Sequence, residues 1–205
     1  HLFSSAASDV YKRQVIFDLW YIGKIGISEL AGVAYIFPIF MLTSMLSNGA
    51  FGGAISGATA RAFGGKNLHL AECIFRSAIL ISLLGALLMM LLFFSISERF
   101  FIFMKIDQEV RSAALSYGNI LLGGIFLIWL FNIVISITRG SGNTIMPAFS
   151  WLIVLSSHVL LASFNFNYLD GNFILKNNVV FLSENYLFNS LEWSAISLLS
   201  GYFFG

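Results

Sequence analysis

Long runs without a charged residue are the feature that most constrains this chain. Four such runs occur, namely Leu30–Ala60, Ser77–Ser97, Ser112–Thr138 and Gly140–Leu169. A helix that crosses the hydrocarbon core of a bilayer needs about 20 predominantly apolar residues. Each run is therefore expected to form one spanning helix, because none is long enough for two helices and a turn.

Helix is the expected structure, since backbone groups in lipid must pair within their own segment and the alternation of a barrel strand is absent. Two shorter apolar segments, Val15–Ile27 and Trp193–Gly205, are interpreted as incomplete helices. The predicted fold class is all-α, a polytopic transmembrane bundle of about six helices. Residues 1–14 are polar and similar to a translated library adapter. They are treated as a non-native segment before a partial transmembrane bundle at 15–205.

Composition supports a membrane protein and excludes several other classes. Hydrophobic residues make up 58% of the chain and charged residues 10%, whereas soluble domains carry about 25% charged residues. The formal net charge of +1 and the single cysteine argue against a nucleic-acid-binding module and a disulfide scaffold. No metal-type His/Cys spacing and no nucleophile beside a base is present. We therefore expect no enzyme, no metal site and no nucleic-acid partner.

Charge in the connecting segments predicts the orientation. Basic residues outnumber acidic ones at 61–76, and Arg139 is the one charged residue of the turn at 139–147. The segment at 98–111 is balanced, and 170–192 is acidic. Lys and Arg concentrate on the cytoplasmic side of membrane proteins. The chain is thus predicted to be a multi-pass protein of the cytoplasmic membrane, with 61–76 and 139–147 inside.

Small residues cluster in the first full span. Gly49, Gly53 and Gly57 are spaced four apart and form a groove that another backbone could approach closely. Two interpretations remain open: ordinary helix packing, or a face that repacks during a transport cycle. Pro38, in the same window, predicts a kink with freed carbonyls.

Asp18 is the most informative single residue. If its helix ends near Gly26, the carboxylate lies about 12 Å inside it, close to the middle of the bilayer. A carboxylate there costs at least ~2.5–3.5 kcal/mol, so it must face a cavity or a partner. Asp18 is therefore a candidate coupling-ion residue. The alternative is that the incomplete helix places it nearer an interface.

Other polar residues lie deep in the predicted spans. His158, eleven residues after Pro147, is about 16 Å deep. It could exchange protons or remain a neutral hydrogen-bonding group. Asn132, seven residues before Arg139, is about 10 Å deep; it could bind substrate or an ion, or join two helices. Asn132 and Asn48 are the candidate residues of a substrate cavity.

Three motifs resemble the multidrug and toxic compound extrusion (MATE) family over residues 17–147. FDLWYIGKIG (17–26) is similar to the end of that family's first helix. NGAFGGAISGATARAFGGKN (48–67) is similar to its small-residue helix, with Arg61 and Gly64 in the closing turn. SITRGSGNTIMP (136–147) is similar to the turn between its fourth and fifth helices. In that turn the helix-breaking residues Gly140 and Gly142 end one helix, and Pro147 suits the start of the next.

The resemblance implies one lobe of a two-lobe antiporter. Such a protein exports organic, often cationic, compounds in exchange for H⁺ or Na⁺, needs no other cofactor, and requires a second, C-terminal lobe. Asp18 matches the family's helix-one acid. His158 and Ala162 stand where Asn and an acidic or Asn residue are usual, so the coupling ion stays open.

Two alternatives to this export function remain. A lipid-linked oligosaccharide flippase of the same superfamily should have an Arg- and Lys-rich cavity, yet the four uncharged runs contain neither residue. The other alternative is a non-transporting membrane scaffold or remnant.

Overall fold

The computed structural model is helical wherever a regular element is described. It describes the backbone of residues 19–20, 22–23, 26–175 and 190–204. Side chains are described at the same positions up to Leu161, and in the last helix at 192 and 194–203. The elements are α2 (Ile27–Ser44), η1 (Met45–Phe51), α3 (Gly52–Gly64), α4 (Leu68–Phe103), α5 (Gln108–Gly123), α6 (Ile125–Gly140), α7 (Ile145–Leu175) and α8 (Ser190–Phe204). The predicted all-α bundle is confirmed. Asp18 and the adapter-like segment lie outside the described residues.

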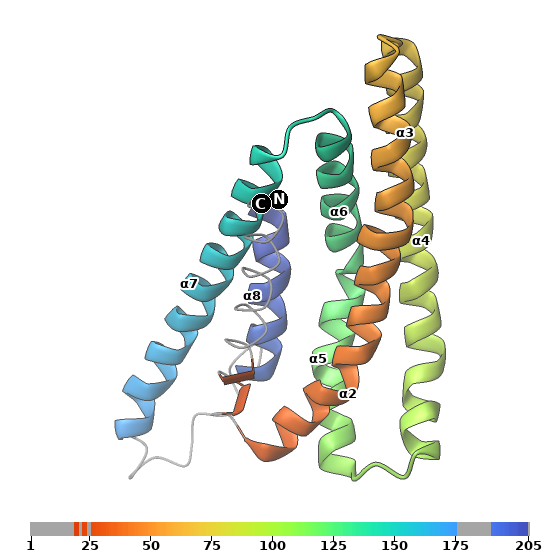
Figure 1. Cartoon of the computed structure of the whole chain (residues 1–205). Helices are drawn as coiled ribbons and strands as arrows, with labels where there is room; N and C mark the ends of the chain where they lie inside the picture. The colour runs from red at the N-terminus through yellow and green to blue at the C-terminus, as the bar shows by residue number, and fades with distance from the viewer. Residues whose placement is uncertain (1–18, 21, 24–25, 176–189, 205) are drawn as a thin grey trace.

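α2, η1 and α3 form one continuous helical rod, Ile27–Gly64. Its 38 residues give a length on the order of 55 Å, well beyond the 30 Å of a hydrocarbon core. Pro38 lies inside α2 without ending it. Figure 1 shows the rod changing direction along α2 before it rises into α3.

α4 runs back along α3 as the second half of a long hairpin (Figure 1). The turn between them uses Lys66 at a positive φ of 52°. Asn67 then caps α4, because its side-chain oxygen accepts a hydrogen bond of 2.9 Å from the backbone N–H of Leu70. The exposed leucines along α4 are those expected of a surface that faces lipid.

The run Ser112–Thr138 differs from expectation, because it holds two helices instead of one. α5 and α6 meet at Gly124 with a bend of 45°. The backbone dihedral angles of Gly124, φ −94° and ψ 10°, lie outside the α-helical region. A side chain there would collide with Leu199 of α8. The break thus lets α8 pack closely against the point where the direction of the chain changes.

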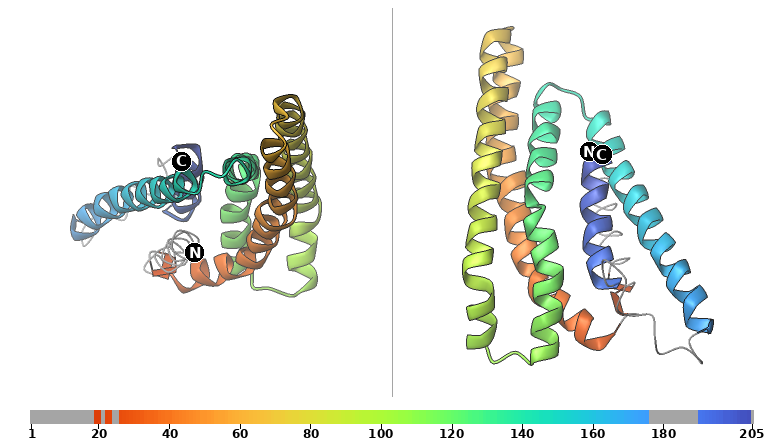
Figure 2. Two further views of the ribbon diagram at one scale, coloured as in Figure 1. Left: turned by 45° about the horizontal axis from the view of Figure 1, so that its top comes forward. Right: turned by 180° about the vertical axis from the view of Figure 1, so that it is seen from behind.

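Two described helical stretches, Ile27–Gly64 and Leu68–Phe103, are long and apolar enough to cross a membrane. A third results if α5 and α6 count as one broken span. The apolar stretches described in α7 and α8 are shorter. Figure 2 shows α7 and α8 on the opposite side of α6 from the α3–α4 hairpin, so α6 lies at the centre of the bundle.

The buried core is built around α5 and α6. Trp129 is 1% exposed, and Leu122 and Ile128 are fully buried. The Trp129 ring lies over Gly85 of α4, where a side chain would collide with it. The absence of a side chain at Gly85 therefore lets α4 approach α6 closely.

Replacing Gly85 with valine should destabilise the protein, because the new methyl groups would enter the space of the Trp129 ring. Overpacking of this kind costs roughly 1–3 kcal/mol. Thermal unfolding of the full-length protein in detergent measures the loss. Gly53→Val is the matched control, since no described atom lies within 4 Å of a Cβ at Gly53. Equal losses in both variants would contradict this packing account.

Candidate functional site: the polar seam between η1 and α6

η1 is a π-helical segment at the centre of the long rod. Segments of this kind are rare and often mark functional sites. Their i→i+5 bonding rotates consecutive side chains by less than the 100° of an α-helix. Ser47 and Asn48 can therefore both face α6, although they are neighbours in the sequence.

Four hydrogen bonds form what we call the polar seam, made of Ser47, Asn48, Asn132, Ser136 and Arg139. The side-chain amide of Asn132 donates to the hydroxyl of Ser47 at 2.8 Å. The guanidinium of Arg139 donates to the side-chain oxygen of Asn48 at 2.7 Å and to the Ser136 hydroxyl at 3.0 Å. The Ser136 hydroxyl donates to the backbone oxygen of Asn132 at 2.7 Å.

Two glycines let the helices carrying the seam approach closely. A Cβ on Gly52 of α3 would lie 2.5 Å from the Ser136 hydroxyl. A Cβ on Gly140 of α6 would lie 2.5 Å from the backbone oxygen of Ser56 and 2.7 Å from Thr59. Asn132, Ser136 and Gly140 recur every four residues and so lie on one face of α6.

Asn132 keeps an acceptor that no described group satisfies. Its side chain is 2% exposed, and its Oδ1 has no hydrogen-bond partner. A buried carbonyl without a partner costs about 1–3 kcal/mol. A water molecule, a cation or a donor on a cargo molecule would satisfy this oxygen.

Arg139 is exposed at the end of α6, and its guanidinium folds back along its own helix. Arginines near the ends of spanning helices usually extend toward the headgroups. The guanidinium of Arg139 instead lies against Ser136, one turn back along its own helix, and Asn48 of η1. Both of these partners are neutral. A positive charge is thereby held beside the polar residues of η1.

His158 occupies a different place, between α7 and α8. It is fully buried, and its Nδ1 lies 3.1 Å from the hydroxyl of Ser197. That hydroxyl donates to the backbone oxygen of Ser194 at 2.9 Å. The Ser197 hydroxyl therefore lies between two hydrogen-bond partners, and the tautomer of His158 decides whether it donates to Nδ1 or accepts from it. The relation of His158 to Asp18 lies outside the described residues.

The other sequence-predicted residues lie apart from the polar seam. Gly49 and Gly53 are exposed, with no described atom within 4 Å of a Cβ on either. Gly57 approaches only the Arg61 side chain of its own helix. The helices therefore approach closely at Gly52 and Gly140, and not at Gly49, Gly53 or Gly57.

The remaining motif residues lie at helix ends. Arg61 and Gly64 are in the last turn of α3. Gly142, at a φ of 92°, lies in the turn after α6, and Pro147 lies in the first turn of α7.

Sequence reasoning missed Ser47, Ser136 and Ser197. Each hydroxyl also bonds to a backbone oxygen of its own helix, a role that serines have in many helices. For Ser136, the spacing of four from both Asn132 and Gly140 was an available signal. Among the described residues, no group of three or more His, Cys, Asp or Glu side chains could hold a metal ion.

Comparisons with known proteins place this geometry in a family. The family model MatE matches residues 15–164. A crystal structure of a MATE mutant matches with a TM-score of 0.80 and 21% identity, over 98% of this chain and 41% of that one. A MOP superfamily transporter from Pyrococcus furiosus, described as having a binding pocket of reverse polarity, matches with a TM-score of 0.78 and 20% identity over 98% and 40%.

A multidrug resistance MATE family transporter in its outward-facing conformation matches with a TM-score of 0.77 and 20% identity, over 97% of this chain and 40% of that one. No curated protein matches the chain. The chain thus spans about 40% of the length of these solved structures.

Ser47→Ala should weaken the polar seam, because the amide of Asn132 would lose its acceptor. Hydrogen bonds between membrane helices are worth roughly 0.6–2 kcal/mol. Thermal unfolding of the full-length protein should show a loss of that size. Ser156→Ala is the control, since the exposed Ser156 hydroxyl donates to Leu152 of its own helix. An unchanged stability in Ser47→Ala would show that the hydrogen bond between Asn132 and Ser47 does not stabilise the protein.

Proposed function

The chain belongs to the MatE family, and from that premise we propose that it forms one lobe of a cation-coupled efflux antiporter. The antiporter exports organic, often cationic, compounds across the cytoplasmic membrane. The family match over residues 15–164 is the observation that carries this proposal. Because the chain spans about 40% of the solved transporters, the proposal includes a second lobe that completes the central cavity.

Asp18 is the proposed coupling residue. It is the one carboxylate in the apolar segment Val15–Ile27, and an acid at that depth is costly unless it binds a proton, a cation or a partner. Binding of H⁺ or Na⁺ from outside would alter the packing of its helix and lower the affinity of the cavity for cargo. Ion and cargo thereby exchange by favouring different conformations of the lobe.

The polar seam supports a role in cargo binding for Asn132 and Asn48. The unpartnered Oδ1 of Asn132 is an acceptor, which suits an N–H donor or a positive charge on an organic cation. Asn48 is already engaged by Arg139, so cargo that binds Asn48 must compete with that guanidinium. Selectivity would then depend on how cargo rearranges the Arg139–Asn48 pair.

A flippase for lipid-linked oligosaccharides is the less favoured function. Its cavity would need several Lys or Arg residues for a pyrophosphate group. In the described spans only Arg139, at the end of α6, directs its charge toward the polar residues of η1. One such cation is a poor match for a doubly charged anionic cargo.

Asp18→Asn in the full-length gene should abolish gradient-driven export, because the amide cannot take up a proton or neutralise a bound cation. Drug resistance of cells and uptake by everted vesicles measure this effect. Asp107→Asn is the control, since Asp107 is exposed in the turn between α4 and α5. Unimpaired export by Asp18→Asn that still depends on the ion gradient would contradict the assigned role.

A further inference from the structure

The α3–α4 hairpin extends beyond the rest of the bundle at the end where α6 meets α7 (Figure 1). The contact of Gly140 with Ser56 and Thr59 places the end of α6 level with the middle of α3. α3 continues to Gly64, six residues or about 9 Å farther along its axis. The headgroup layer on one side of a bilayer is about 5–7 Å thick. With the end of α6 at the hydrocarbon boundary, Arg61 lies within the headgroup layer and the tip of the hairpin reaches its outer edge.

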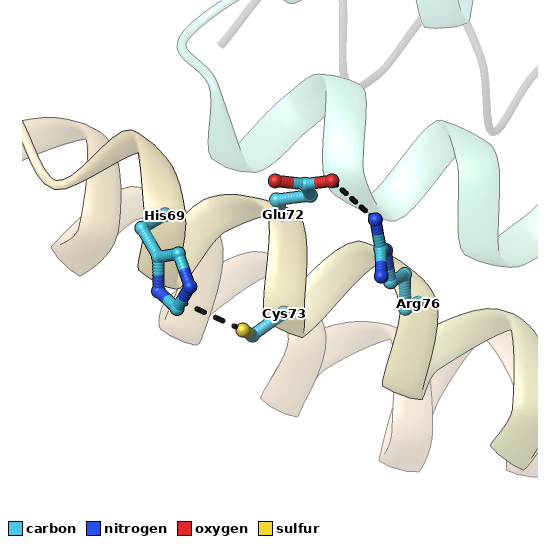
Figure 3. Close-up of polar contacts among 4 residues, drawn as sticks. All are labelled: His69, Glu72, Cys73 and Arg76. Atoms are coloured by element: carbon cyan, nitrogen blue, oxygen red, sulfur yellow. Dashed lines mark hydrogen bonds and ion pairs between the residues drawn. The ribbon is translucent and has the colours of Figure 1, made fainter.

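The hairpin end carries two basic side chains without an acidic partner. Arg76 pairs with Glu72 at 2.6 Å, and His69 lies 3.9 Å from the sulfur of Cys73 (Figure 3). Neither Arg61 nor Lys66 forms an ion pair with a described residue. Both are exposed. Their charges are therefore available to an anionic group in the headgroup layer.

Apolar side chains surround these two charges. Leu68 is 71% exposed, Leu70 45% and Phe63 43%. Exposed apolar groups interspersed with Lys and Arg are typical of protein surfaces that lie in the membrane interface. The apolar side chains can enter the upper part of the acyl layer, while the cations remain at the level of the phosphates.

The opposite end of α4, where it leads into α5, differs in its net charge. Arg99 and Lys105 are also exposed there and form no ion pair with a described residue, but segment 98–111 carries as many acidic as basic residues and so has no net charge. Negative surface potential attracts clustered basic residues by about 1 kcal/mol for each Lys or Arg. An anionic membrane surface therefore favours the α3–α4 end over the α4–α5 end.

We propose that the hairpin end, defined by Arg61, Phe63, Lys66, Leu68 and Leu70, binds the phosphate groups of anionic phospholipids. The occupant is a lipid headgroup with its acyl chains, because the apolar side chains next to the cations suit acyl chains better than a free anion in water. This surface begins two residues beyond Thr59, which contacts Gly140 at the end of α6, but its proposed role does not depend on which cargo is transported.

The test is native mass spectrometry of the full-length protein, titrated with phosphatidylglycerol and, separately, with phosphatidylcholine. Arg61→Gln combined with Lys66→Gln should weaken the tightest phosphatidylglycerol binding roughly 30-fold. Binding of phosphatidylcholine should not change. Arg99→Gln combined with Lys105→Gln is the matched control and should leave phosphatidylglycerol binding unaltered. The charge-preserving pair Arg61→Lys and Lys66→Arg should retain it.

Several outcomes would overturn the proposal. Equal binding of the two lipids by the unmodified protein would remove the preference for anionic headgroups. Unchanged phosphatidylglycerol binding in the Arg61 and Lys66 double variant would place the lipid elsewhere. Displacement of phosphatidylglycerol by an equal concentration of inorganic phosphate would indicate a site for free anions. Preferential binding of poly-glutamate at this end would indicate an acidic protein as the partner.

Discussion

The hydrogen bonds between η1 and α6 are the contacts on which the arrangement of this lobe depends. The bilayer core offers no water to a polar group, so each must find its partner within the protein. Ser47 and Asn132 do so across 85 residues of sequence. Asn48 and Arg139 repeat the same connection nearer the end of α6. These two bonds join polar positions that would be costly in isolated helices and so define which faces of η1 and α6 meet.

Close packing extends this contact to the rest of the bundle. Gly52 and Gly140 allow α3 and α6 to touch through backbone atoms. Trp129, three residues before Asn132 on the same face of α6, fills the space over Gly85 and brings α4 into the same core. Gly124 turns the chain from α5 into α6 and lets α8 pack against the bend. α6 thus positions the polar seam and also connects it to the helices that face lipid.

Local sequence patterns predicted much of this fold, because in lipid a charged residue marks where a span ends. The runs Leu30–Ala60 and Ser77–Ser97 each fall within one continuous described helix. The absence of charge did not predict the break at Gly124; its local signal is the glycine pair Gly123–Gly124, and its contact with Leu199 depends on α8, which is distant in sequence.

The site was predicted less completely than the spans. Asn132 and His158 are buried within the bundle, and their predicted depth in the bilayer stays a prediction. Their serine partners and the π-helical turn arise from contacts between helices, which no local pattern encodes. Asp18, on which the proposed coupling rests, lies outside the described residues.

The central functional claim is that this lobe belongs to a protein whose export of organic compounds is driven by an inward cation gradient. Purified full-length protein in liposomes, loaded with a fluorescent organic cation, provides the most direct measurement. The account predicts dye movement when a pH or Na⁺ gradient is imposed and its arrest when an ionophore collapses that gradient. Dye movement at the same rate with and without the gradient would contradict it.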